Sequence, residues 1–320
     1  MKWPSISIII PSFNQGRFIE RTLLSIFKQD YPGDVQVIVS DGGSSDETTE
    51  ILRKYPEITW WSKGDEGLVD AINQGFSAAT GDVLAIQSSD DFYLPDAFVR
   101  SITELVQDSS LALVSGCDVY LMGDGKSFSC SALDDHNITP RSLMMRRVIP
   151  QHCAFFWRSM LKITGGLGPE ISEGAEIDLW YRALHFVEAR FIPHHTAVYQ
   201  FHDQQRTVKG DRWYQSLTQI VESCEADEKF ASRFRFDALD KQVLYQRWLL
   251  QEARRSGNEA RVAVLLDELS RGASDETITF LIRQGFLPKS ATANPRHPNH
   301  RVPDIHWSEP KRDTTDRRAA

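Results

Sequence analysis

Apolar and polar stretches alternate along the first 110 residues in a pattern that predicts strands separated by helices. The runs typical of buried strands are SISIIIP (5–11), VQVIVS (35–40), ITWWS (58–62) and DVLAIQ (82–87). Apolar residues at helical spacing predict helices over residues 18–27, 46–54, 69–79 and 95–106, the last with Pro95 in its first turn. Strands joined by helices of this length predict an α/β fold with a doubly wound, mostly parallel sheet.

The regular alternation of predicted strands and helices ends at about residue 110. The strand-like segments LALVSG (111–116), CDVYLM (117–122), CAFFWR (153–158) and TAVYQF (196–201) flank a helix predicted over 176–187. They indicate a mixed or antiparallel extension of the first sheet. From about residue 211 the pattern is helical, with a last short helix ending near Phe280, and residues 289–320 have the composition of a disordered tail.

Composition narrows the class of protein only a little. The chain has 320 residues, of which 41% are apolar and 25% charged, as in ordinary soluble proteins. A net charge of −8 argues against nucleic acid as a partner. The four cysteines lack CxxC spacing, and no apolar run is long enough to span a bilayer. With no room for a signal peptide before the first strand, we expect a cytoplasmic protein, with any membrane contact peripheral and at the inner face.

Polar, turn-forming residues follow each of the four predicted parallel strands. These segments are PSFNQGR (11–17), SDGGSSD (40–46), KGDEG (63–67) and SSDD (88–91). Turns and helix caps explain any one of them. In an open parallel sheet, however, ligands bind beyond the carboxyl ends of the strands, so four such segments on one edge predict a ligand site.

The acidic residues of these segments suggest separate tasks. Asp90 and Asp91 follow a buried strand and could give oxygen ligands to Mg²⁺ or Mn²⁺, which bind one or two carboxylates together with substrate phosphates. Asp41 ends another strand, too far along the edge to share that ion. It could accept hydrogen bonds from a base or a ribose.

Taken in order, these segments and three later ones resemble the family 2 glycosyltransferases, which have the GT-A fold. The later segments are QHCAFF (151–156), AEIDLWYR (175–182) and YQFH (199–202), and the resemblance covers about residues 5–205. It implies a GT-A domain over 1–210, with a nucleotide-binding half (1–110) and an acceptor half (111–210). A helical region (211–288) and the tail (289–320) would follow.

The resemblance also implies a role for individual residues. The donor site would be lined by Pro11, Ser12, Phe13, Asn14, Asp41, Asp65, Asp70 and Ser89. Within it, Asp41 would bind the base, while Asp65 and Asp70 would face the nucleotide or the sugar.

The metal ligands and the base follow from the same resemblance. Asp90 matches the last acid of the family's DxD element and would bind Mn²⁺ or Mg²⁺ on the diphosphate, with His202 completing the site. Glu176 matches the catalytic base, and Asp178, two residues away, is its rival. Ser88 stands at the first DxD position, which leaves fewer anionic ligands, and Val69 replaces a common tyrosine.

The expected activity is an inverting transfer of sugar from a nucleotide-sugar, by default a UDP-sugar, to a saccharide or lipid-linked glycan. The helical region after residue 211 could touch a membrane, cover the acceptor cleft or form a homodimer. One alternative is a sugar-nucleotide nucleotidyltransferase, which the single glycine and single arginine of PSFNQGR count against. The other is a non-catalytic nucleotide-sugar-binding relative, for which Ser88 is the support.

Overall fold

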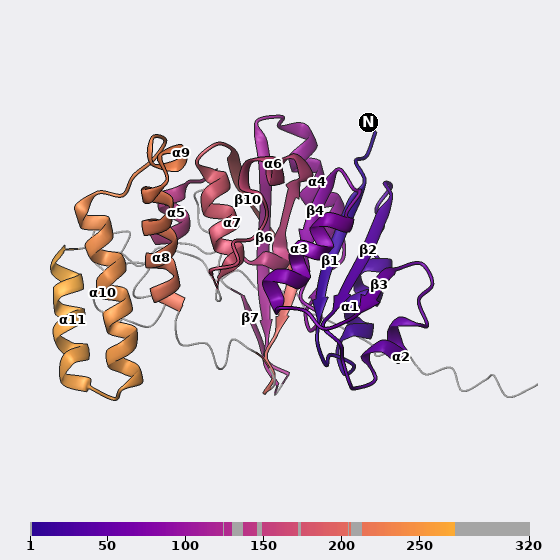
Figure 1. Ribbon diagram of the computed structural model, residues 1–320, viewed down its shortest axis with the longest axis horizontal. Coiled ribbons are helices and arrows are strands. Elements are labelled where there is room, and N and C mark those ends of the chain that lie inside the picture. The colour runs from indigo at the N-terminus through magenta and orange to yellow at the C-terminus, as the bar shows by residue number, and fades with distance from the viewer. Residues whose placement is uncertain are drawn as a thin grey trace, which may run out of the picture.

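The computed structural model describes residues 2–123, 125–129, 137–145, 149–171, 174–203, 205 and 213–272. A central sheet is flanked by helices, and helices α8 to α11 stand side by side at one end of the molecule (Figure 1). The strands are β1 (Ile6–Ser12), β2 (Val35–Asp41), β3 (Thr59–Ser62), β4 (Val83–Ile86), β5 (Phe92–Tyr93), β6 (Leu111–Leu121), β7 (Ser127–Ser129), β8 (Asn137–Ile138), β9 (Ala154–Trp157) and β10 (Glu188–Gln200). The helices are α1 (Ile19–Phe27), α2 (Thr48–Leu52), α3 (Leu68–Ala78), α4 (Ala97–Gln107), α5 (Pro140–Met145), α6 (Leu161–Thr164), α7 (Ala175–Leu184), α8 (Trp213–Ala226), α9 (Glu228–Ala231), α10 (Ala238–Arg255) and α11 (Glu259–Gly272), with 3₁₀ turns η1 (Gln151–Cys153) and η2 (Arg158–Met160).

The first half is the parallel sheet that the sequence predicts. Strands β3, β2, β1 and β4 lie in this order, all parallel. Every residue of β1 is buried, because helices cover both faces of the sheet. Ile9 packs with Phe76 of α3 on one face, whereas Ile8 packs with Leu23 of α1 and Phe98 of α4 on the other. This two-sided burial explains why apolar residues occupy the consecutive positions 8–11 of β1 instead of every second position.

The second half extends this sheet with strands of both directions, as the sequence predicts. The order continues β4-β9-β6-β10-β5, with β9 antiparallel to both of its neighbours and β10 parallel to β6. Strand β6 therefore runs in the same direction as β4. Strands β1, β2, β3, β4, β6 and β10 all end at one edge of the sheet, the carboxyl edge, and η1 lies there because β9 starts there.

Two local predictions are wrong. The two segments predicted at 111–116 and 117–122 lie on the single strand β6, which ends at Leu121. Its Gly116 lies so close to β10 that a Cβ there would be 2.2 Å from Thr196 Oγ1. This glycine marks a close approach of two strands, not a strand end. In addition, α4 begins at Ala97 rather than Pro95, because Asp96 is left-handed (φ 62°) and interrupts the chain before the helix.

The C-terminal helices share a hydrophobic core with one face of the sheet. Leu217 of α8, Val243 of α10 and Leu265 of α11 belong to the same buried cluster as Ile9 and Phe156. None of the helices in the described part of the chain is long and apolar enough to cross a membrane. The helix predicted to end near Phe280 and the tail 289–320 lie outside the described residues.

Candidate active site

Hydrogen bonds join the loops that follow β1 and β2 at the carboxyl edge. The Asn14 N–H donates to Ser44 Oγ (2.7 Å), and the Ser45 N–H donates to Asn14 Oδ1 (2.9 Å). The Gly16 N–H donates to Asp46 Oδ2 (2.9 Å). Asn14 has a left-handed backbone (φ 53°), which asparagine adopts more readily than most residues. These contacts fix the shape of the first loop before any ligand binds.

Asp41 and Asp65 occupy adjacent strand ends. The buried Asp41 carboxylate accepts hydrogen bonds from Ser62 Oγ (2.6 Å), the Ser44 N–H (2.9 Å), the Gly43 N–H (3.2 Å) and Ser44 Oγ. Asp65 Oδ2 lies 2.8 Å from the place where a Cβ on Gly42 would stand, so only glycine allows this approach. The Asp41 carboxylate is thus held by its own turn, and its contact with a base stays a prediction.

The other residues expected at the donor site differ in exposure. The side chain of Phe13 is 59% exposed, whereas Pro11, Ser12 and Ser89 are buried. Asp70, on the first turn of α3, accepts a hydrogen bond from Gln74 Nε2 (2.7 Å). Phe13 therefore offers an open aromatic face beside β1, while Ser12 and Ser89 present little surface to a ligand.

Asp90 and His202 meet at the carboxyl edge, although 112 positions separate them in the sequence. His202 Nε2 lies 2.9 Å from Asp90 Oδ2, and the two side chains are 6% and 18% exposed. The imidazole also stacks on Phe18, with 4.3 Å between ring centroids. A hollow of about 410 Å³ opens beside His202, lined by Arg17, Leu121, Met122, Gly123, Gly125, Gln200, Phe201, His202 and Asp203.

The idea that both carboxylates of the SSDD segment face one ion is wrong. Asp91 is 1% exposed, and its Oδ1 accepts a hydrogen bond from the Gln200 N–H (2.9 Å). Burial, together with the charge of Asp90, raises the pKa of Asp91 above its usual value. Asp90 lies in the turn before β5 and keeps a partly exposed side chain next to His202, which lines the hollow, while the side chain of Asp91 enters the interior.

The interior neighbour of Asp91 is His152 in η1. His152 is 4% exposed; its Nδ1 lies 3.6 Å from Asp91 Oδ2 and its Nε2 lies 3.6 Å from Asp118 Oδ2. Burial by itself lowers the pKa of His152, but Cys153, Asp118 and Asp91 together raise it well above its usual value. His152 thus lines no open cleft. It forms part of a buried carboxylate–imidazole–carboxylate chain that the sequence did not predict.

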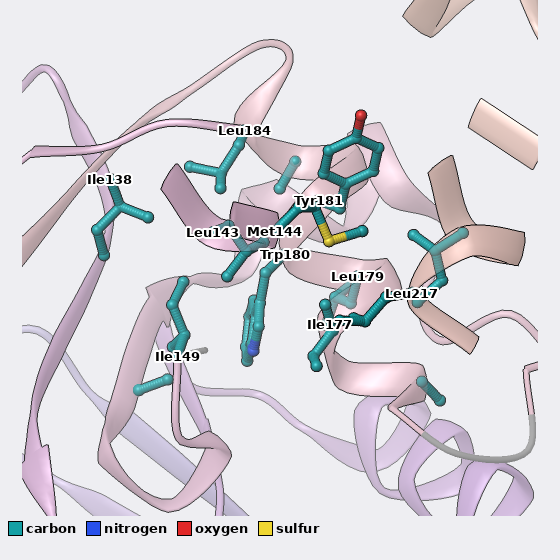
Figure 2. Close-up of a cluster of buried hydrophobic side chains, with 14 of the residues drawn as sticks. Ile138, Leu143, Met144, Ile149, Ile177, Leu179, Trp180, Tyr181, Leu184 and Leu217 are labelled. Carbon is teal, nitrogen blue, oxygen red and sulfur yellow. The ribbon is translucent and has the colours of Figure 1, made fainter. Parts of the chain in front are cut away.

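The two acids of α7 have different surroundings. Figure 2 shows Trp180 and Tyr181 extending to different sides of this helix, and both are fully buried. Their packing fixes α7, so the half-buried Glu176 has a defined place in its first turn. Asp178 Oδ2 accepts hydrogen bonds from Arg182 Nε (2.9 Å) and an Arg182 terminal nitrogen (2.7 Å). This engagement favours Glu176 over Asp178 as the base.

We therefore expect Asp178 to stabilise the folded protein and to take no direct part in catalysis. The Asp178 and Arg182 side chains are 8% and 14% exposed, and Asp178→Asn leaves a mostly buried guanidinium without its counter-ion. The expected loss of unfolding free energy is about 3 kcal/mol in urea titrations. Glu228→Gln is the control. It breaks the pair with Arg235, in which the Arg235 and Glu228 side chains are 57% and 85% exposed, and it should cost less than about 1 kcal/mol. Unchanged stability with lost catalysis would instead identify Asp178 as the base.

A larger hollow, of about 800 Å³, lies at the opposite edge of the sheet. Its lining includes Lys2 and Trp3 before β1, Asp82 before β4, and Trp157 and Arg158 at the end of β9. None of the predicted site residues lines it. Ligands of parallel sheets bind at the carboxyl ends of the strands, so the hollow beside His202 is the better candidate.

The chemistry of Asp90 and His202 fits a divalent cation. Two neighbouring ligands of an octahedral ion, each about 2.1 Å from it, lie about 3 Å apart. The 2.9 Å between Asp90 Oδ2 and His202 Nε2 is a hydrogen-bond distance here, and it is also compatible with this spacing. Within the described ranges, no three His, Cys, Asp or Glu side chains are arranged to hold an ion together. A carboxylate and an imidazole fit Mn²⁺ or Mg²⁺ that shares its coordination with substrate phosphates.

Comparisons with known proteins agree with this picture. The model of the family "Glycosyl transferase family 2" matches residues 7–162. An uncharacterized glycosyltransferase of Mycobacterium tuberculosis is 32% identical over 187 residues, which are 56% of this chain and 69% of the relative.

Two solved structures share the fold at low sequence identity. S. aureus TarS (residues 1–349), in complex with UDP-GlcNAc, superposes with a TM-score of 0.60 at 14% identity and covers 88% of this chain and 84% of its own. The mannosyltransferase PcManGT of Pyrobaculum calidifontis, in complex with GDP-Man and Mn²⁺, gives 0.59 at 20% identity, covering 88% and 79%. At these identities the likeness concerns the fold.

The mostly parallel sheet, the acidic carboxyl edge and these similarities define an enzyme: a glycosyltransferase of the GT-A fold. The sequence matches specify it further. The chain belongs to glycosyl transferase family 2.

Proposed function

We propose that this enzyme transfers a sugar, with inversion, from a nucleoside diphosphate sugar to a hydroxyl of a saccharide or lipid-linked glycan. The observation that carries the proposal is the contact of Asp90 with His202 at the carboxyl edge, beside an open hollow. A UDP-sugar is the default donor. TarS was solved with UDP-GlcNAc and PcManGT with GDP-Man, so a donor panel needs both nucleotides.

Each group has a separate task in the proposed reaction. Asp41, Asp65 and the Pro11–Asn14 loop bind and orient the nucleotide. Asp90 and His202 would hold a divalent ion, which when bound would supply positive charge to stabilise the departing diphosphate, an effect worth several kcal/mol. Glu176 accepts the proton of the acceptor hydroxyl, a contribution of about 10²–10⁴-fold. One base and no carboxylate nucleophile predict a single displacement and therefore inversion.

The wider organisation is also a proposal. We infer that residues 1–210 carry donor binding and catalysis, and that the helices after residue 211 support α7 or contact the acceptor. The contact of α8 with α7 and their shared core favour the first of these roles. Peripheral contact with a membrane and formation of a homodimer are outcomes for vesicle sedimentation and light scattering to decide.

The direct test is nucleoside diphosphate release from a panel of UDP-, GDP- and dTDP-sugars, with saccharide acceptors. We expect release from one donor class, abolished by EDTA and restored by Mn²⁺ or Mg²⁺. Pyrophosphate release from a sugar phosphate and a nucleoside triphosphate would indicate the nucleotidyltransferase instead. Donor binding without turnover across the acceptor panel would indicate a non-catalytic relative, and full activity in EDTA would contradict the metal assignment.

A further inference from the structure

Two consecutive residues of η1 contact the Ser88–Asp91 segment, here called the metal loop. Gln151 Nε2 donates a hydrogen bond to Ser88 Oγ (2.8 Å) at the start of the loop. At the end of the loop, His152 Nδ1 lies 3.6 Å from Asp91 Oδ2. Because η1 precedes β9, which pairs antiparallel with β4, these two residues stand directly beside the end of the strand that leads into the loop.

The other side of Asp91 joins the metal loop to the strand that leads to His202. Asp91 Oδ1 accepts a hydrogen bond from the Gln200 N–H (2.9 Å), two residues before His202. Both ends of the Asp90–His202 pair are therefore tied to one buried carboxylate. A shift of Asp91 reaches Asp90 along the chain but reaches His202 only through the Gln200 hydrogen bond, so the two displacements differ and the separation of the two metal-binding atoms changes.

His152 is the ion-pair partner of this carboxylate in the interior, at 3.6 Å rather than at hydrogen-bond distance. It lies between Asp91 and Asp118 of β6, and both acids are almost fully buried. Two buried carboxylates near each other repel and lack water, so an imidazole between them compensates both. Asp118 belongs to a rigid, buried strand, and the chain Asp118–His152–Asp91 thus connects the metal loop to the centre of the sheet.

We propose that Gln151 and His152 are positioning residues that set the spacing of Asp90 and His202 and so determine the affinity for the metal–nucleotide complex. This inference rests on the proposed function, because it concerns the same site. Residues behind the ligands of a metal commonly change its affinity by about 10–100-fold when they are altered.

The two ring nitrogens of His152 allow a matched pair of variants. The side-chain amide nitrogen of asparagine can replace Nδ1, which faces Asp91, whereas that of glutamine can replace Nε2, which faces Asp118. His152→Asn therefore keeps the contact with the metal loop, and His152→Gln keeps only the contact with β6. Both remove the imidazole, so both should lower thermal stability to a similar degree.

The readout is Mn²⁺ binding to the full chain, measured by the electron paramagnetic resonance signal of free Mn²⁺ with UDP or GDP present. We expect His152→Gln to weaken binding roughly tenfold or more, and His152→Asn to stay within about threefold of the wild type. Gln151→Met, which loses one hydrogen bond and threatens the fold least, should weaken binding roughly three- to tenfold. Leu265→Ala, which truncates a buried side chain of α11, should lower thermal stability without changing Mn²⁺ affinity.

The outcomes separate this inference from the proposed function. If the wild type fails to bind Mn²⁺ in the presence of UDP and also in the presence of GDP, the metal site of the proposed function is wrong and the inference falls with it. If the wild type binds but the Asn and Gln variants weaken binding equally, in step with stability, His152 has only a structural role and the inference alone is overturned. Should either His152 variant fail to fold, Gln151→Met decides: wild-type affinity in that variant overturns the inference.

Discussion

Asp90→Asn is expected to lower metal-dependent turnover by roughly 10³-fold or more. The side chain loses its negative charge at the atom 2.9 Å from His202 Nε2, so the pair no longer offers an anionic ligand to a cation. Several kcal/mol of charge stabilisation at the diphosphate are then lost, and about 1.4 kcal/mol corresponds to tenfold in rate. The measurement is nucleoside diphosphate release as a function of Mn²⁺ concentration.

The fold should tolerate this change. The charge of Asp90 contributes to the raised pKa of the buried Asp91, so its removal relieves repulsion rather than breaking a core contact. Thermal stability is therefore expected to be at least that of the wild type. Asp34→Asn is the matched control, since Asp34 is an exposed acid before β2 at the other edge of the sheet. Wild-type turnover by Asp90→Asn, with an unchanged Mn²⁺ requirement, would show that the metal is held elsewhere.

Glu176→Gln is expected to lower sugar transfer by about 10²–10⁴-fold while donor affinity stays unchanged. The amide keeps the size of the side chain and its place in the first turn of α7, but it cannot accept a proton from an alcohol. Donor affinity from calorimetry and transfer rate at saturating donor should therefore separate. Glu176→Asp, which retains a carboxylate on a shorter stem, should show an intermediate loss.

Glu222→Gln provides the comparison for this prediction, because Glu222 is exposed on α8 and its change should leave both quantities unaltered. A parallel loss of donor affinity in Glu176→Gln would place Glu176 in the donor site rather than on the acceptor. Normal transfer would move the base to another residue. The pairing of Asp178 with Arg182 makes Asp178 a poor substitute, since two guanidinium nitrogens already engage its Oδ2.

The first half of the fold could be predicted because its signals are local. Consecutive apolar positions such as 8–11 indicate strands buried on both faces. Helices of ordinary length between such strands leave a parallel sheet as the simplest arrangement. The second half was harder. Gly116 resembles a strand end in sequence, yet it marks a close approach of β6 and β10, a relation between residues 80 positions apart that no local pattern contains.

The site, too, has features that local sequence signals indicated and features that depend on distant residues. The polar segments at the strand ends and the resemblance to a family indicated Asp90, His202 and Glu176 as candidates, and their roles remain predictions. The difference between Asp90 and Asp91 was not predictable, because both are acids in one segment and only the surrounding strands determine which one is buried. His152 gave a weaker signal still, as a lone histidine in a short segment.

The sequence by itself determined that this chain forms a mostly parallel α/β sheet with acidic loops at its carboxyl edge, because strand and helix periodicities and turn residues act over a few neighbouring positions. Only the tertiary structure decided which acids meet which partners. Asp90 with His202, and Asp91 with Gln200 and His152, depend on strand order and on the direction of β9. The physical reason is that burial and charge at a side chain depend on groups brought together in space, and chain folding brings them from distant positions.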